Sequence, residues 1–234
     1  MNGNSKKHLV ILTGAGISAE SGIRTFRDSD GLWMGHDIHE VASPGGWKKN
    51  PKLVLDFYNA RRRDIAAAVP NSAHEGLAAL EELFEVTIIT QNIDDLHERA
   101  GSSRIIHLHG EIFRKKSCLD DSLTEEVRSD MLFGEIAPDG APWRPDIVWF
   151  EEPVPMISSA ASVTATADVF IIIGTSLQVY PAAGLVDFCR QGTPVFLIDK
   201  QIPSTKGLRN YHPIEMTASE GVGKLSMLLE SAYL

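Results

Sequence analysis

The chain has 234 residues, a formal net charge of −9, and 43% apolar and 23% charged residues. That length suffices for one sizeable core, or for one domain with a small insert, and the composition is typical of a soluble globular protein. The negative charge argues against nucleic-acid binding. No apolar run approaches the roughly 20 residues that span a bilayer, and no signal-peptide pattern opens the chain, so we expect a cytoplasmic protein that does not enter membranes. The two cysteines, Cys118 and Cys189, do not suggest a disulfide framework.

Short, nearly uninterrupted apolar runs predict five strands, at residues 8–13, 86–90, 146–150, 169–173 and 194–198. Such runs suit strands that are buried on both faces, as in a parallel sheet. A shorter run at 104–106 predicts a further strand end. Apolar residues at helical spacing lie between several of these runs, at 72–83 and 181–190. This alternation predicts an α/β fold with a Rossmann-like, doubly wound parallel sheet.

Two stretches interrupt the alternation. Residues 30–75 contain Trp33, Trp47 and a predicted helix over 51–69, whereas residues 112–145 are polar and rich in turn-forming residues. We expect these two insertions to pack together as a small second domain. The main domain would then consist of residues 1–29, 76–111 and 146–234.

A glycine-rich loop follows the first predicted strand, with the sequence Gly14-Ala15-Gly16-Ile17-Ser18-Ala19-Glu20-Ser21-Gly22. Glycines at this place let the backbone approach a pyrophosphate, and the next helix N-terminus favours negative charge. The spacing departs from Gly-x-Gly-x-x-Gly, and no acidic ribose partner follows at about 20 residues. Taken alone, the loop fits a structural turn as well as a ligand site. The residues that follow, up to Trp33, suit either a clamp for a charged, ring-bearing ligand or an ordinary surface loop.

Polar side chains follow two more predicted strands. Thr90-Gln91-Asn92-Ile93-Asp94 ends the second strand, and Gly174-Thr175-Ser176 ends the one at 169–173. Ligands of open α/β sheets bind at the carboxyl ends of the strands, where these groups would lie. Asn and Gln read hydroxyls and amides, and Asp orients an amide or a histidine. The alternative for Asn92 and Asp94 is a helix cap on residues 96–98.

The segment His107-Leu108-His109-Gly110 closes the run at 104–106. A neutral imidazole accepts a proton near pH 7, so a histidine at a strand end suits a general base. The alternatives are a structural histidine, or a metal pair, because alternate strand residues share a face. Two histidines alone do not make a zinc site.

These segments follow one another in a single order: Gly-Ala-Gly-Ile-Ser-Ala-Glu-Ser-Gly, Thr-Gln-Asn-Ile-Asp, His-Gly, Arg-Pro-x-Ile-Val-Trp-Phe and Gly-Thr-Ser-Leu-x-Val-x-Pro-Ala. The series closely resembles the sirtuin (Sir2) family of NAD-dependent protein-lysine deacylases, from His8 to about Leu229. The resemblance implies that the main domain binds NAD as its cofactor. It also implies that proteins with acylated lysines are the substrates.

The resemblance implies roles for particular residues. Those that would wrap the pyrophosphate and the nicotinamide ribose are Gly14, Ala15, Gly16, Ser18, Glu20, Thr25, Phe26, Arg27 and Trp33. Those that would contact the ribose and the nicotinamide pocket are Gln91, Asn92, Ile93 and Asp94. Those that would bind the adenosine-side phosphates and ribose are Gly174, Thr175 and Ser176. Those that would hold the adenine ribose are Asp199, Lys200 and Gln201, while Ala218 would flank the adenine.

For catalysis, the resemblance makes His109 the general base, which accepts a proton from a ribose hydroxyl of NAD. The products would be nicotinamide, an O-acyl-ADP-ribose and free lysine, and the reaction needs no covalent enzyme nucleophile. Residues 146–150 and 177–180 would clasp the substrate backbone as an added strand. The Val148 carbonyl would accept the acyl-lysine N–H.

Tyr58 and Arg61 are three residues apart on the predicted helix, so they share a face. Arg presents a fork that matches a carboxylate, and Tyr adds a hydroxyl donor. The pair occupies the position that marks the desuccinylase-like branch of sirtuins, and it would select succinyl, malonyl or glutaryl groups. The alternative is a solvated basic run from Arg61 to Arg63, with Arg61 bridging to Asp64.

Two features depart from the family pattern. Most sirtuins bind zinc through two Cys-x-x-Cys pairs in the small domain, but residues 112–145 contain only Cys118. We therefore expect no zinc, and a small domain held by the packing of Phe113, Leu132, Phe133 and Trp143. Glu151 stands where the family usually has glycine, so its side chain would crowd or repel a substrate peptide.

The same scaffold allows other activities: mono-ADP-ribosyl transfer to protein, hydrolysis of NAD, or non-catalytic sensing of NAD or ADP-ribose. The presence of His109 and of the Tyr58/Arg61 pair favours deacylation. We further expect a monomer.

Overall fold

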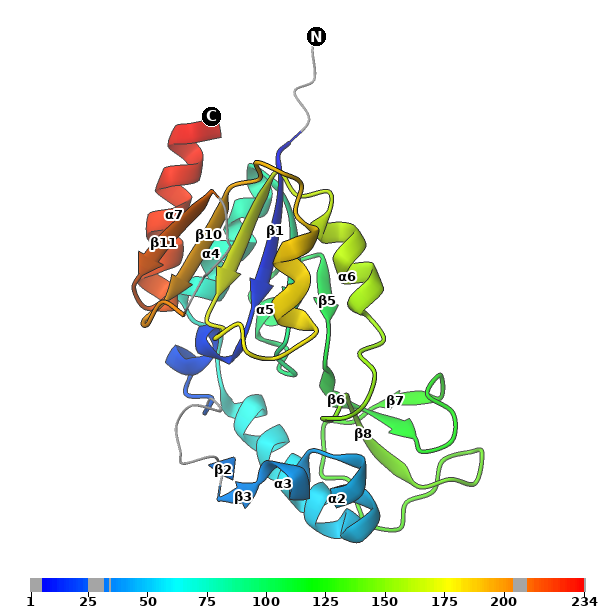
Figure 1. Cartoon of the computed structure of the whole chain (residues 1–234). Coiled ribbons are helices and arrows are strands. Elements are labelled where there is room, and N and C mark those ends of the chain that lie inside the picture. Colours follow the sequence, from blue (N-terminus) through cyan, green and yellow to red (C-terminus); the bar gives the residue numbers. More distant parts are fainter. Residues whose placement is uncertain (1–5, 25–31, 34, 204–209, 234) are drawn as a thin grey trace.

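The computed structural model describes residues 6–24, 32–33, 35–203 and 210–233. Its centre is a six-stranded sheet with the order β11-β10-β9-β1-β4-β5, in which all neighbouring strands are parallel (Figure 1). The strands are β1 (His8–Thr13), β4 (Glu85–Thr90), β5 (Ile105–His107), β9 (Val169–Ile173), β10 (Val195–Asp199) and β11 (Tyr211–Glu215). The predicted Rossmann-like parallel sheet is confirmed.

Helices cover both faces of this sheet. Leu9 and Ile11 of β1 belong to one core cluster, together with residues of α4 (Ser72–Ala79) and α7 (Ala218–Tyr233). Val10 and Leu12 belong to the opposite cluster, with residues of α6 (Ile157–Thr164) and of the 3-10 helix η4 (Ala182–Phe188). Because both faces are buried, successive residues of the strand are all apolar, which explains the uninterrupted runs in the sequence.

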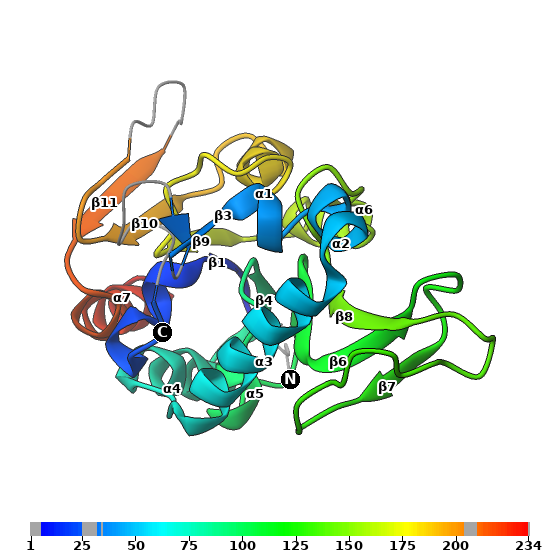
Figure 2. The same ribbon diagram turned by 90° about the horizontal axis from the view of Figure 1, so that it is seen from below.

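A smaller part lies below the carboxyl ends of the strands in Figure 1. Its helices are α1 (Ile38–Val41), α2 (Pro44–Lys49) and α3 (Pro51–Ala67). Its strands are β2 (Leu32–Trp33), β3 (His36–Asp37), β6 (Gly110–Ser117), β7 (Thr124–Glu126) and β8 (Trp143–Ile147). Strands β7, β6 and β8 form a separate antiparallel sheet, and α3 lies beside β6 and β8 in the view from below (Figure 2).

The two insertions share a core. Val54 and Phe57 of α3 pack in one cluster with Ile112 of β6 and Ile147 of β8. The start of α3 is set locally, because the Asn50 side chain accepts a hydrogen bond from Leu53 N and Pro51 stands at the first helical position. The two insertions therefore pack together, while the exact domain boundaries stay a prediction.

Some predicted elements are wrong in place or type. The run at 146–150 is not a strand of the central sheet: β8 ends at Ile147 and pairs with β6. The run is apolar because Trp149 is buried against Tyr58 of α3, with Trp149 Nε1 donating to the Tyr58 hydroxyl at 3.1 Å. The helix predicted at 181–190 is the 3-10 helix η4.

The predicted core of residues 112–145 is also partly wrong. Phe113 and Trp143 are buried, but Leu132 and Phe133 are each 65% exposed. Met131 takes their place beneath α3, where its backbone N–H donates to Asn59 Oδ1 and its carbonyl accepts from Asn59 Nδ2.

Among the described helices, none is both long and apolar enough to cross a membrane.

Candidate active site

The loops after β1 and β9 touch each other at the carboxyl edge of the central sheet. Gly14 N donates to the Ile173 carbonyl at 3.0 Å, and Gly16 N donates to the Gly174 carbonyl at 2.8 Å. A Cβ atom on Gly14 or Gly16 would come within 2.8 Å of the Gly174 oxygen, so no larger residue fits without movement. Gly174 itself has φ +64, a conformation that favours glycine. These glycines therefore bring two backbone segments together at the strand ends.

Ser18, Asn92 and Asp94 form a buried hydrogen-bonded group beside these loops. Asn92 Nδ2 donates to the Gly14 carbonyl at 3.2 Å and to Ser18 Oγ at 3.1 Å. Ser18 Oγ donates to Asp94 Oδ2 at 3.0 Å, and Leu96 N donates to Asp94 Oδ1 at 3.2 Å. Burial raises the pKa of Asp94, although these two hydrogen bonds oppose the shift. Asn92 and Asp94 thus hold the end of β4 against the glycine loop, and the bond from Leu96 N ties Asp94 to the start of α5 (Leu96–Arg99), whose N-cap residue is Asp95.

His109 lies half-buried just after β5. Its Nδ1 is 2.9 Å from the Gln91 carbonyl oxygen. Because a carbonyl only accepts hydrogen bonds, Nδ1 carries the proton of the neutral ring and Nε2 keeps its lone pair. Burial lowers the pKa of His109, and the bond to Gln91 opposes that shift only in part. The ring is therefore oriented and held in the form that accepts a proton at Nε2.

Gln91 connects this histidine to the neighbouring strand end. While its carbonyl accepts from His109, its side-chain Nε2 donates to Thr175 Oγ1 at 3.1 Å. Gly110, which follows His109, has φ +83, and a Cβ there would lie 2.0 Å from the Asp146 carbonyl oxygen. A glycine at position 110 is thus needed for β6 to start against β8.

Tyr58 and Arg61 of α3 are both buried, and Arg61 is only 7% exposed. The Arg61 guanidinium carbon lies 4.6 Å from the ring centroid of Trp33. Burial lowers the pKa of Arg61, while Tyr58, Asp94 and Asp64 act in the opposite direction. Burial also raises the pKa of Tyr58, so its hydroxyl stays protonated. The alternative of a solvated basic run is wrong for Arg61.

The basic run divides into buried and exposed members. Arg62 is also buried, and its Nε donates to the Ile112 carbonyl at 2.9 Å. Arg63 is the exposed member, and its Nη1 lies 2.5 Å from Asp130 Oδ2. Arg63 is therefore a natural control for the buried Arg61.

The other residues to which the sequence assigns NAD binding lie along the same carboxyl edge of the sheet. Glu20 is exposed and its Oε2 accepts from Ser219 N at 3.0 Å, which ties the glycine loop to the start of α7 beside the buried Ala218. Asp199 is buried at the end of β10, where its Oδ1 accepts from Gln201 N. The structure leaves Lys200 and Gln201 exposed and Ile93 and Ser176 half-buried. Three assigned residues, Thr25, Phe26 and Arg27, lie outside the described residues.

A group of buried, hydrogen-bonded residues at the ends of β1 and β4 was not predicted from the sequence. Thr13 Oγ1 donates to Thr90 Oγ1 at 2.9 Å and lies 3.0 Å from His97 Nε2. The Thr90 hydroxyl in turn accepts from Asn92 N at 3.1 Å. Burial lowers the pKa of both His97 and the adjacent His74. In the sequence, this group could have been recognised only from the threonine that ends each of the apolar strands β1 and β4.

The two histidines of the His-Leu-His segment do not act as a metal pair. His107 Nε2 lies 2.7 Å from Glu98 Oε1 and its Nδ1 lies 3.3 Å from the Asn92 carbonyl oxygen, so both ring nitrogens of His107 have protein partners. Burial alone would lower the pKa of His107, but Glu98, Glu111 and the Asn92 carbonyl together outweigh it and the pKa is raised. Within the described residues, no three His, Cys, Asp or Glu side chains converge on a metal position. Cys118 is the one cysteine of residues 112–145, and a single thiolate does not fit a structural zinc site.

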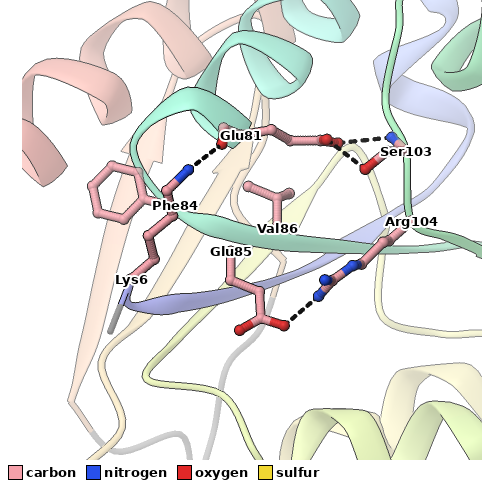
Figure 3. A pocket seen from close by; sticks show the side chains of 7 residues that line it. All are labelled: Lys6, Glu81, Phe84, Glu85, Val86, Ser103 and Arg104. Carbon is pink, nitrogen blue, oxygen red and sulfur yellow. Dashed lines mark hydrogen bonds and ion pairs between the residues drawn. The ribbon is translucent and has the colours of Figure 1, made fainter. Parts of the chain in front are cut away.

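A cavity of about 350 Å³ lies at the opposite edge of the sheet, near the amino ends of β1 and β4 (Figure 3). Lys6 Nζ donates to the Glu81 carbonyl, and Glu81 accepts from Ser103, while Arg104 pairs with Glu85. Since these charged groups already have partners in the cavity wall and the cavity lies at the opposite end of the strands from His109, it is not part of the candidate active site.

The fold and the site are those of α/β proteins that bind ligands at the carboxyl edge of a parallel sheet. The Sir2 family model matches residues 14–181. A Helicobacter pylori protein named NAD-dependent protein deacylase is 55% identical over 212 residues, which cover 91% of this chain and 93% of that relative. A Bacteroides thetaiotaomicron protein of the same name is 49% identical over 229 residues, 95% of this chain and 98% of that relative.

Solved structures agree with these relatives. A Sir2 homologue in complex with NAD is 37% identical, has a TM-score of 0.86, and the match covers 97% of this chain and 91% of that one. A variant Sir2 homologue in complex with ADP-ribose is 37% identical with a TM-score of 0.88, covering 97% and 93%. This chain therefore belongs to the Sir2 family, as its motifs predicted.

Proposed function

We propose that this chain is an NAD-dependent protein-lysine deacylase. The reaction would transfer the acyl group of a modified lysine to the ADP-ribose part of NAD and would release nicotinamide, O-acyl-ADP-ribose and free lysine. The observation that carries the proposal is the geometry of His109, whose ring is fixed through Nδ1 with Nε2 left as the base. The names of the relatives and the NAD and ADP-ribose complexes of the structural neighbours support the same reaction.

In this proposal His109 is the general base. NAD, when bound, supplies the ribose that receives the acyl group and the nicotinamide that leaves. His109 Nε2 takes the proton of a ribose hydroxyl, and the Gln91 carbonyl stabilises the imidazolium through Nδ1–H. Because burial lowers the pKa of His109, the ring is neutral and ready to accept a proton at neutral pH.

The residues at the carboxyl edge fit a dinucleotide. The glycine loop and Gly174 meet backbone to backbone at the strand ends, where a pyrophosphate would lie, and the buried Asp199 can accept hydrogen bonds from vicinal hydroxyls. We assign the nicotinamide side to Ser18, Asn92 and Asp94. The assignments to Glu20, Trp33, Ile93, Ser176, Lys200, Gln201 and Ala218, and to Thr25, Phe26 and Arg27, belong to the same proposal.

We assign the reading of the acyl group to Tyr58 and Arg61. An arginine that is buried on the Trp33 ring binds a carboxylate strongly, because pairing offsets the unfavourable burial of its charge. The Tyr58 hydroxyl, which accepts from Trp149 Nε1, is a donor at a fixed place. Acyl groups that end in a carboxylate, such as succinyl and malonyl, would therefore be preferred over acetyl.

The test compares kcat/KM for matched acetyl- and succinyl-lysine peptides in the presence of NAD. Arg61→Met should lower succinyl turnover by roughly 10- to 100-fold and keep acetyl turnover, since a charge-assisted bond is lost only for the acidic acyl group. Arg63→Met, on the exposed side of the same helix, is the matched control and should change neither. Equal turnover of both peptides by the unmodified protein would make it a plain deacetylase.

Two other outcomes would overturn the deacylase proposal. Release of nicotinamide without loss of the acyl group would indicate ADP-ribosyl transfer or NAD hydrolysis. Binding of NAD without nicotinamide release would indicate a sensor.

The proposal also includes acylated-lysine proteins as partners, a monomeric state and a cytoplasmic location. Size-exclusion chromatography and cell fractionation test the last two.

A further inference from the structure

Two residues at the proposed substrate clasp, which consists of residues 146–150 and 177–180, have an unusual backbone conformation. Among the described residues, the non-glycine residues with positive φ are Glu151 (+74), Leu177 (+55) and Asn210 (+50). Asn adopts this region readily, but Glu and Leu do so rarely. Glu151 follows the first arm of the clasp and Leu177 begins the second. Such conformations persist where the surrounding structure enforces them, and they gather at functional sites.

Glu151 is anchored close to the catalytic histidine by the backbone. Val148 N donates to the His109 carbonyl at 2.9 Å, and Phe150 N donates to the Ala42 carbonyl at 3.0 Å. Glu151 is three residues beyond Val148, so its backbone lies within about 11 Å of it even if the chain is fully extended. A substrate strand advances about 3.3 Å per residue, so Glu151 is within reach of the residues that flank the acyl-lysine.

The two acidic residues of this turn have different surroundings. Glu152 points inward, where its two carboxylate oxygens accept from Arg144 at 2.6 and 3.0 Å and from Trp149 N at 2.8 Å. The Glu151 side chain is 66% exposed. Its partner in the structure is His39, whose Nδ1 lies 4.0 Å from Glu151 Oε1 and whose side chain is 69% exposed. Glu151 therefore offers a hydrated carboxylate that an incoming cation can pair with.

We propose that Glu151 selects acyl-lysine substrates that carry a lysine or arginine next to the modified residue. The inference rests on the proposed deacylase function and adds a preference in the peptide sequence. A flanking ammonium or guanidinium group would pair with the Glu151 carboxylate, while a flanking acidic residue would be repelled. Because the Glu151 side chain extends into solvent, its negative charge lies beside the clasp, where a bound peptide can reach it. This inference refines the expectation that Glu151 would crowd or repel a substrate peptide, because it limits the repulsion to acidic flanking residues.

The test uses three acyl-lysine peptides that differ in one flanking residue, Arg, Ala or Glu, with NAD and detection of the deacylated peptide. An exposed ion pair predicts that kcat/KM for the Arg peptide exceeds that for the Ala peptide by roughly 3- to 5-fold. The Glu peptide should be lower than the Ala peptide by a similar factor. Added salt should narrow both ratios, because screening weakens exposed pairs.

Three variants separate charge from conformation. Glu151→Gln keeps the side-chain length and should bring the three peptides to within about 2-fold of one another. Glu151→Gly should also lose the preference and in addition raise the Tm, because glycine adopts φ +74 without strain. Glu40→Gln removes an exposed carboxylate from the adjacent helix α1 and should keep the full preference.

The outcomes distinguish this inference from the function on which it rests. Turnover of all three peptides by the unmodified protein at equal kcat/KM would overturn the role of Glu151 and leave the deacylase intact. A preference that survives in Glu151→Gln would also overturn it. Failure to turn over any of the peptides, including the Ala peptide, would overturn the deacylase proposal and this inference with it.

Discussion

The carboxyl ends and the amino ends of the strands in the central sheet differ in how their polar groups are paired. These two sides of the sheet are called here the carboxyl edge and the amino edge. At the carboxyl edge, Thr13 and Asn92 are buried and bonded to other buried side chains of the same edge. At the amino edge, Lys6 and Arg104 bond to exposed partners around an open cavity (Figure 3). Strands β1 and β4 contribute residues to both edges, so the difference comes from what covers each end.

This difference explains why the cavity at the amino edge is not the candidate active site. Buried hydrogen bonds fix the position of a group, because a buried donor or acceptor that loses its partner destabilises the folded state. Exposed ion pairs contribute little and tolerate rearrangement. The carboxyl edge can therefore hold His109 and Asn92 in fixed positions for chemistry, whereas the amino edge only closes the sheet against solvent.

The largest effect is expected from His109→Ala, which removes the proposed base. Loss of general-base catalysis should lower kcat by about 10²- to 10⁴-fold. Binding of NAD, measured by calorimetry, should change far less, and an unchanged kcat would contradict the role of His109. In the unmodified protein, kcat/KM should rise with pH and reach half its plateau below pH 6.5, because burial lowers the pKa of the residue that must be neutral.

The next effect concerns stability in acid. Burial lowers the pKa of His74 to about 4, so between pH 6.5 and 4 the unfolded chain binds a proton that the folded chain does not. The stability that the neutral His74 contributes is fully present above pH 6.5. As the pH falls, the free energy of unfolding decreases, by up to roughly 3 kcal/mol at pH 4. Urea unfolding at a series of pH values measures the slope. His74→Gln should have a smaller slope, and an identical one would exclude this histidine as the cause.

A smaller effect is expected from Thr13→Val, which keeps the shape of the side chain. The change leaves the Thr90 hydroxyl and His97 Nε2 without their buried partner, so the free energy of unfolding should fall by about 1–3 kcal/mol. Because Thr90 also holds Asn92 N, KM for NAD should rise as well. Chemical denaturation and steady-state kinetics test the two parts. A neutral substitution would show that this network is replaceable by apolar packing.

The smallest effect is expected at the amino edge. Arg104→Ala breaks the exposed pair with Glu85, and the free energy of unfolding should change by no more than about 0.5 kcal/mol. The value of kcat/KM should stay the same, because the pair lies at the far edge of the sheet. A loss comparable to that of Thr13→Val would remove the distinction between the two edges.

The sequence predicted the fold better at the centre of the sheet than at its margins. Strands such as β1 and β9 are buried on both faces, so their apolar runs are unmistakable. Strand β11 escaped prediction because it is an edge strand, where polar residues and Pro213 are tolerated. The run at 146–150 was misplaced because its burial comes from packing on α3, and an apolar run does not reveal its partner.

The sequence by itself determined the family and the residue types at the strand ends, because both lie in contiguous motifs. Only the tertiary structure decided that Arg61 is buried on Trp33 while Arg63 is exposed, since helix α3 has one face toward a core that the sequence assembles from distant segments. It also decided which histidine is poised as a base: both rings bond to a backbone carbonyl through Nδ1, but the Nε2 of His107 is also bonded to Glu98. Tautomer and pKa depend on the partner of each ring nitrogen, and those partners come from other elements of the fold.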